Sequence, residues 1–80
     1  MSRRTPLPAW VLTRRSALGH RIAALRGAAG MSRDQLAELA GLERRSIQRY
    51  EGAVRDPRYS DLLLISRALN VTVAQLTEEE

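Results

Sequence analysis

Four side chains that can hydrogen-bond to the edges of nucleic-acid bases lie within six residues of one another: Arg44, Arg45, Gln48 and Arg49. A guanidinium can donate two parallel hydrogen bonds to guanine, and a glutamine amide can pair with adenine. At about 100° per residue in a helix, these four cover one arc of about 140°, and Ile47 and Tyr50 fall on the opposite arc. The pattern predicts a helix with one face for a core and one for a polar partner.

The helix that must carry these side chains spans roughly 43–51, and a second short helix precedes it. Ser32 and Gln35 form the S-x-x-Q pattern of a capping box, which marks the start of that preceding helix. Gly41 supplies the permissive backbone that a sharp turn between the two helices requires. Two helices joined in this way form a helix-turn-helix, whose second helix enters the major groove of DNA.

Three further helices are expected around this pair. The first begins near Pro8 or only near Thr13, and it ends at Gly30, a residue suited to a helix C-terminus. Pro57 lies in a loop and forces the residue before it away from helical dihedral angles. A fourth helix then runs over about 59–69, judged from its three- and four-residue apolar spacing.

The fifth predicted helix is short and opens at a second capping box, Thr72 with Gln75. No stretch of the chain shows strand-like alternation, so we expect an all-α fold. Apolar spacing places one set of residues in a common core: Leu18, Ile22, Leu25, Ala29, Leu36, Leu39, Ala40, Ile47, Tyr50, Leu62, Ile65 and Leu69. Trp10 is expected in the core or at a dimer contact rather than stacked on a base.

Composition limits the class of protein. The chain has 80 residues, enough for one small domain, and its 13 basic residues are all arginine against 9 acidic ones, giving a net charge of +4. This balance favours a polyanionic partner. There is no cysteine and only one histidine, His20, so we expect no metal and no cofactor. No apolar run reaches the roughly 18 residues of a membrane span, and we expect a cytoplasmic, nucleoid-associated protein without a membrane partner.

With these residues placed, the chain resembles the XRE-like, Cro/cI-type helix-turn-helix family of bacterial and phage regulators. The resemblance covers about 17–76 and rests on the order and spacing of several short motifs: Gly19-His20-Arg21-Ile22, Leu25-Arg26, Met31-Ser32, Leu36-Ala37, Gly41-Leu42, Ser46-Ile47, Glu51, Pro57, Leu62-Leu63-Leu64-Ile65 and Ala68-Leu69-Asn70-Val71. It implies a compact five-helix lambda-repressor-like DNA-binding domain.

The resemblance also implies roles for individual residues. Arg44, Arg45 and Arg49 correspond to positions that read bases, and Arg33 to one that meets a phosphate or a base. An ion pair is implied between Arg26 of the first helix and Glu51 of the third. The sequence departs from the family at two positions: Arg33 replaces the usual glutamine, and Ala53 replaces the glycine usually found two residues after the glutamate, which leaves the end of the third helix open.

Further contacts follow from the residues themselves. Arg55 and Arg58, in the loop before the fourth helix, are expected to contact phosphates rather than bases. Ser32 caps its helix and leaves first-turn N–H groups that can bind a phosphate. Arg3 and Arg4 either reach DNA as an N-terminal arm or are disordered. We divide the chain into an arm with the possible start of the first helix (1–12), a DNA-binding domain (13–77) and an acidic tail (78–80).

We therefore predict a sequence-specific DNA-binding transcriptional regulator, and not an enzyme, because no activated nucleophile or paired carboxylates are present. One domain offers few base contacts, so we expect a homodimer on a palindromic operator, with repression as the default and no small-molecule ligand. The candidate dimer surface comprises Leu63, Leu64, Val73 and Leu76; the alternative is a fuller core. The rival functions are a protein-interaction module, such as an antitoxin-like partner or an adaptor, and RNA binding.

Overall fold

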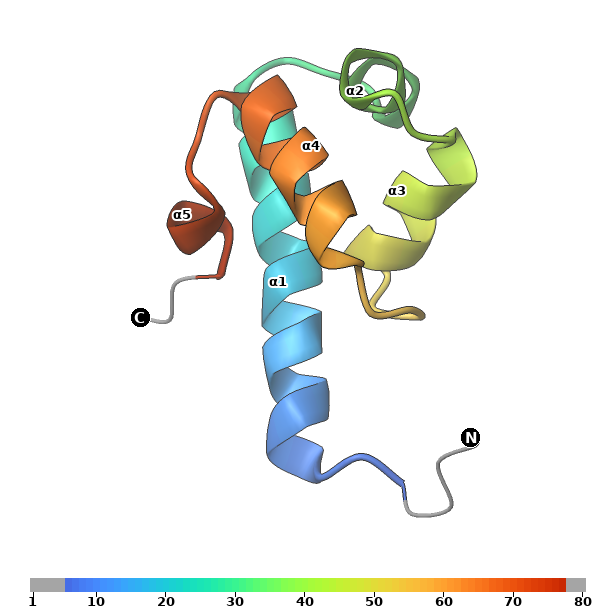
Figure 1. Cartoon of the computed structure of the whole chain (residues 1–80), viewed down its shortest axis with the longest axis vertical. Coiled ribbons are helices and arrows are strands. Elements are labelled where there is room, and N and C mark those ends of the chain that lie inside the picture. Colours follow the sequence, from blue (N-terminus) through green and yellow to red (C-terminus); the bar gives the residue numbers. More distant parts are fainter. Residues whose placement is uncertain (1–5, 78–80) are drawn as a thin grey trace.

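The computed structural model describes residues 6–77. Within this range the chain is all-helical, as predicted, and its helices follow one another in the order α1 (Ala9–Ala28), α2 (Arg33–Ala40), α3 (Arg44–Glu51), α4 (Tyr59–Leu69) and α5 (Val73–Thr77) (Figure 1). The candidate arm residues Arg3 and Arg4 and the acidic tail 78–80 lie outside the described residues. None of the helices in the described part is long and apolar enough to cross a membrane.

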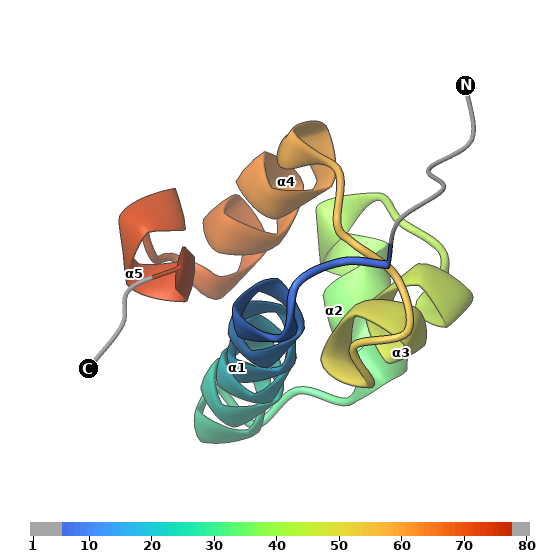
Figure 2. The ribbon, with the colours of Figure 1, turned by 90° about the horizontal axis from the view of Figure 1, so that it is seen from below.

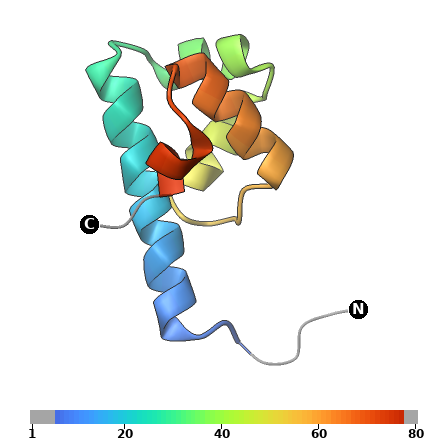
Figure 3. The ribbon, with the colours of Figure 1, turned by 60° about the vertical axis from the view of Figure 1, so that its left-hand side comes forward.

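The helix α1 is the longest element, and its N-terminal turns project beyond the rest of the molecule (Figures 1 and 3). It begins at Ala9, the earlier of the two predicted starts. It stops where Gly30 adopts a left-handed backbone, with φ of 71°. The N–H of Met31 then bonds to the carbonyl of Arg26 at 3.0 Å. This is the Schellman arrangement that a glycine after a helix permits.

Trp10 lies on the projecting part of α1 and corrects the expectation of a core position, since 66% of it is exposed. The reason is its place in the fold: the described elements pack against α1 further along the helix (Figure 3). The guanidinium of Arg14, one turn on, lies over the indole ring with 5.9 Å between its central carbon and the ring centroid.

In the described part of the chain, one hydrophobic core lies between α1, α4, α5 and the α2–α3 pair. Its buried members are Ile22, Leu36, Ala37, Ile47, Tyr50, Ile65, Leu69 and Leu76. Two predicted members are wrong: Leu39 is 63% exposed, and Ala29 is exposed because it follows the last residue of α1. Leu39 points away because α2 presents Leu36, Ala37 and Ala40 to the core, and residue 39 falls outside that arc.

The turn between α2 and α3 depends on Gly41, whose φ of 72° is left-handed. The N–H of Leu42 bonds back to the carbonyl of Ala37 at 2.9 Å, so the last turn of α2 closes on itself. The chain then reverses and α3 starts after Glu43. The predicted turn glycine is therefore present in the predicted role, and it sets the angle at which α3 leaves α2 (Figure 1).

The C-terminal end of α3 is held against α1 at very short range. A Cβ atom placed on Gly19 of α1 would lie 2.6 Å from the carbonyl oxygens of both Tyr50 and Glu51. Only glycine leaves room for that approach. Immediately beyond, Ala53 adopts a left-handed φ of 57°, and the N–H of Val54 bonds to the carbonyl of Arg49 at 3.0 Å. The helix therefore ends with alanine in the position that glycine usually occupies.

The helices α4 and α5 close the other side of the core. Figure 2 shows α5 and α3 on opposite sides of α1. The predicted capping box at the start of α5 is present: Thr72 N–H donates to Gln75 Oε1 at 2.8 Å, and Gln75 N–H donates to Thr72 Oγ1 at 3.0 Å. Leu76 is 1% exposed because α5 packs against α1 and α4 and turns this side chain inward. This burial corrects the prediction that Leu76 belongs to a dimer surface.

Candidate nucleic-acid interface

The helix α3 has the two faces that its sequence predicts. Ile47 is fully buried and Tyr50 is 5% exposed. The Tyr50 hydroxyl donates to the carboxylate of Asp61 on α4. Burial of the phenol is the main cause that raises its pKa, and this hydrogen bond is the second cause. The opposite face carries the candidate base-reading residues, of which three are exposed and Arg49 is half-buried: Arg44, Arg45, Gln48 and Arg49.

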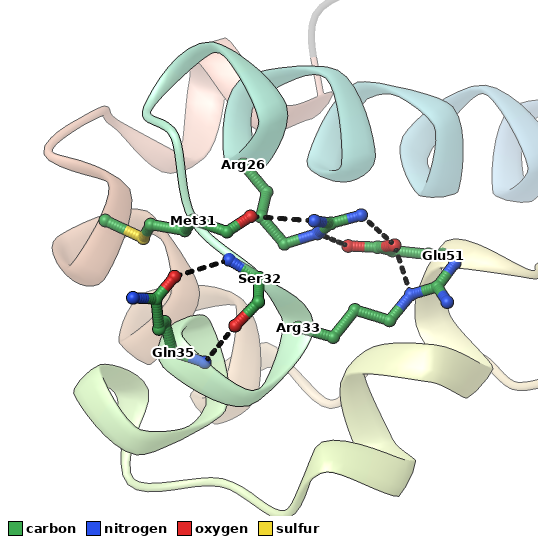
Figure 4. A network of polar contacts seen from close by, with 6 residues as sticks. All are labelled: Arg26, Met31, Ser32, Arg33, Gln35 and Glu51. Carbon is green, nitrogen blue, oxygen red and sulfur yellow. Dashed lines mark hydrogen bonds and ion pairs between the residues drawn. The ribbon is translucent and has the colours of Figure 1, made fainter.

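The N-terminus of α2 is fixed by its capping box. Ser32 N–H donates to Gln35 Oε1 at 2.7 Å, and Gln35 N–H donates to Ser32 Oγ at 3.0 Å (Figure 4). Both side chains are therefore engaged in the cap. What Ser32 leaves available to an anion is the N-terminal end of α2 rather than a free hydroxyl.

A buried carboxylate, Glu51, joins three helices. Arg26 of α1 donates from Nε to Glu51 Oε2 at 2.7 Å and from Nη2 to Oε1 at 3.1 Å, so the ion pair implied by the family resemblance is present. Arg26 also donates from Nη1 to the carbonyl of Met31 at 2.8 Å. Arg33 at the start of α2 donates from Nε to Glu51 Oε1 at 2.9 Å (Figure 4). Only 2% of the Glu51 side chain is exposed.

The charge state of this network follows from its geometry. Burial raises the pKa of Glu51, but the hydrogen bonds from Arg26 and Arg33 outweigh it, and the net pKa lies below the usual glutamate value. The hydrogen bonds with Glu51 raise the pKa of Arg26. Glu51 and Arg26 are therefore both charged near neutral pH, and they meet in a place with little water.

A second ion pair connects α2 and α3 at the other end of α3. Arg44 Nε lies 2.9 Å from Asp34 Oδ1, and both side chains are largely exposed, 56% and 73%. This pair was not predicted from the sequence. The available signal was an acidic residue in the first turn of α2 and an arginine in the first turn of α3, on the two sides of a tight turn.

The structure brings part of the predicted site together around one hollow. This hollow, of about 600 Å³, lies between α1, the start of α2 and α3. It is lined by His20, Ala23, Arg33, Arg45, Gln48, Arg49, Glu51, Gly52 and Val54. Among the described residues, no group of three His, Cys, Asp or Glu side chains is placed to bind a metal. The position of His20 beside three arginines is not predicted by the sequence.

Other candidate residues lie outside the hollow. Arg44 faces Asp34 instead, while Arg55 and Arg58 are exposed on the segment that leads from α3 into α4, where Arg58 is the residue before the first turn. Leu63 and Leu64 on α4 are 44% and 42% exposed, and Val73 on α5 is half-buried. The candidate dimer surface is thus reduced to these three residues.

Comparison with known proteins identifies the family. A helix-turn-helix domain model matches residues 17–78. The restriction-modification controller protein C.AhdI from Aeromonas hydrophila is 30% identical, with 80% of this chain and 97% of that chain covered and a TM-score of 0.78. The P22 c2 repressor, solved with a synthetic operator, is 25% identical, with 79% and 96% covered and a TM-score of 0.73. A search of curated proteins gave no match.

A further similar structure, the hypothetical transcription factor NHTF from Neisseria, is 25% identical over 95% of this chain and 86% of that chain, with a TM-score of 0.77. The matched region contains the helix-turn-helix, the Arg26–Glu51 pair and the basic face of α3. The chain belongs to the XRE-like, Cro/cI-type helix-turn-helix family of DNA-binding transcription regulators.

Proposed function

We propose that the protein binds a specific double-stranded operator as a homodimer, with α3 of each copy in the major groove. The observation that carries this proposal is the face of α3: Arg44, Arg45 and Gln48 are exposed on a helix whose other face and C-terminal end are locked into the core. A rigid helix that presents hydrogen-bond donors is what base recognition needs.

The residues proposed to contact DNA have two roles. Arg44, Arg45 and Arg49 read bases, and Gln48 assists them. A second group contacts phosphates and fixes the position of the domain without specifying sequence: Ser32, through the α2 N-terminus, with Arg33, Arg55 and Arg58. The grouping of Arg33 with Arg45 and Arg49 around one hollow supports a continuous positive surface.

A single copy offers few base contacts, so two copies are expected to bind half-sites about one helical turn apart, ~34 Å. Leu63, Leu64 and Val73 form the proposed dimer surface. Repression by blocking polymerase is the simplest outcome, and we place the protein in the cytoplasm at the nucleoid. The P22 c2 repressor, to which this chain is similar, was solved in complex with a synthetic operator, which supports operator binding.

Operator selection from random duplexes, followed by binding assays on variants, tests the proposal. Arg44→Ala and Arg45→Ala should weaken binding to the selected sequence more than to unrelated DNA, by roughly 5- to 150-fold for each lost guanine contact of about 1–3 kcal/mol. Arg67→Ala, on an exposed part of α4, is the charge-matched control. Equal losses on both DNAs would reject base reading, and a failure to select any sequence would favour the protein-interaction rival.

The phosphate and dimer assignments have their own measurements. The slope of log affinity against log salt should fall by about one in Arg33→Ala if this residue neutralises a phosphate. Leu63→Asp should shift the protein toward monomer in sedimentation and remove cooperative binding to the palindrome, while binding to an isolated half-site persists. An unchanged slope or an unchanged sedimentation profile would remove the respective assignment.

A further inference from the structure

Two neighbouring residues of α2 reach opposite ends of α3. Arg33 bonds to Glu51 in the last turn of α3, and Asp34 pairs with Arg44 in its first turn. The first contact is buried on the glutamate side and belongs to the scaffold. The second lies on the surface, at a side chain proposed to read bases, and packing alone gives no reason for it.

We propose that Asp34 is a positioning residue for base recognition: it holds the guanidinium of Arg44 so that its terminal N–H groups face the DNA. The inference rests on the proposed base-reading role of Arg44. Asp34 does not touch the DNA base in this scheme. It acts on the orientation of the residue that does.

The geometry of the pair specifies which donors remain. A guanidinium carries five N–H donors in a planar fork. The closest approach of the Asp34 carboxylate is to Nε, at 2.9 Å, so the two terminal nitrogens, Nη1 and Nη2, can still donate to DNA. These two can donate in parallel to O6 and N7 of one guanine. Arg44 therefore reads guanine end-on, through its tip rather than through its Nε edge.

The carboxylate has a second effect on selectivity. Asp34 is 73% exposed, so in the proposed complex its negative charge opposes any docking in which Arg44 pairs with a phosphate instead of a base. The favourable position of an acidic residue at a helix N-terminus explains why Asp34 suits α2. That preference does not explain why the Arg44 guanidinium lies beside the Asp34 carboxylate.

The pair gains strength when DNA binds. An exposed ion pair contributes little in water. When the groove covers it, water is displaced, the local dielectric constant falls, and the attraction between the two groups increases. Asp34 is thus expected to affect discrimination between sequences more than the stability of the free protein.

The test compares Asp34→Asn with Glu38→Gln, each alone and in an Arg44→Ala background. Glu38 is an exposed acid one turn further along α2, outside the ion pairs described above. Binding is measured to the selected operator and to a scrambled duplex of equal length. Both single variants should bind the scrambled duplex more tightly by a similar factor, because each loses one negative charge.

Only Asp34→Asn should lower the ratio of operator to scrambled affinity, by about tenfold, and it should have no such effect once Arg44 is alanine. An unchanged ratio, an equal fall in Glu38→Gln, or the same fall without Arg44 would overturn the proposal.

The pair can also be tested without DNA. The Nε–Hε resonance of Arg44 in the NMR spectrum should move in Asp34→Asn and stay in place in Glu38→Gln; equal spectra would overturn the positioning role. If the pair is detected but wild-type protein does not discriminate the operator, the proposed function fails instead.

Discussion

The two ends of α3 are held in opposite ways. At the C-terminal end, Glu51 is buried, two arginines bond to it, and Gly19 of α1 touches the backbone. At the N-terminal end, Arg44 pairs with Asp34 among the described residues, and both side chains are mostly in water. The fold thus fixes one end of the helix to the scaffold and leaves the other free to meet a partner.

Within the eight residues of α3, one end therefore contributes to the stability of the fold and the other end is available for recognition. The buried end can hold the axis of α3 in one direction while the exposed end changes its side chains without disturbing the core. Substitutions at the two ends should therefore have unequal consequences, even where the chemistry of the substitution is the same.

Replacing the buried carboxylate should have the largest effect. Glu51→Gln leaves Arg26 with no anionic partner in a place with little water, and breaking a buried pair costs about 3–5 kcal/mol of unfolding free energy. Asp34→Asn is the matched carboxylate-to-amide change at the exposed end, and it should cost less than about 1 kcal/mol. Urea denaturation followed by circular dichroism at pH 7 gives both values. Equal losses would contradict the difference between the ends.

The same carboxylate predicts a dependence on pH. The pKa of Glu51 is lower in the folded protein than the usual glutamate value. Its contribution to stability is therefore fully present above that usual value, about 4.3, and is lost as the pH falls through the folded pKa. Glu51→Gln should remove this part of the acid dependence, whereas Asp34→Asn should retain it.

Adding a methyl group where α1 touches α3 should have the next largest effect on the free energy of unfolding. In Gly19→Ala the new Cβ would lie 2.6 Å from two backbone carbonyl oxygens, so the helices must separate, at a cost of about 1–3 kcal/mol. Gly27→Ala is the control on the same helix, where nothing lies within 4 Å. It should stabilise the protein by about 0.5–1 kcal/mol, because glycine is unfavourable inside a helix. A similar result for both variants would contradict the close approach.

The smallest effect is a gain in stability just beyond the buried end. Ala53 has a φ of 57°, a conformation that costs an L-residue about 1–2 kcal/mol. Ala53→Gly removes this cost but adds freedom to the unfolded chain, so we expect a net gain of about 0.5–1 kcal/mol, or some 2–8 °C in Tm. Ala24→Gly, at an exposed helical position of α1, should lose a similar amount. A loss in both variants would contradict the strain at Ala53.

Local signals predicted most of the fold. Both capping boxes, the left-handed turn at Gly41 and the bounds of α4 depend on residues close in sequence, and each is found where it was expected. The Arg26–Glu51 pair spans 25 residues, and it was expected only because the family resemblance implied it. The base- and phosphate-contacting roles remain predictions.

What the sequence could not supply was the choice between neighbouring positions in the packed fold. Leu39 and Leu76 are both leucines in helices, yet Leu39 is exposed and Leu76 is buried in the core. The difference arises because α2 turns residue 39 away from the core, whereas α5 turns residue 76 toward it. Gly19 appeared only as part of a family motif. Its role depends on two carbonyl groups more than 30 residues away in the chain, which no local pattern encodes.

The exposed position of Trp10 decides how unfolding of this protein can be observed. Its indole is already two-thirds in water and lies on the projecting turns of α1 (Figure 3). Tryptophan emission will therefore change little when the core melts, and it will follow fraying of the helix end instead. The buried Tyr50, bonded to Asp61, is the intrinsic chromophore that reports on the core. A fluorescence curve and a circular dichroism curve that fail to coincide would reflect where the chromophores lie, and would not by themselves indicate a folding intermediate.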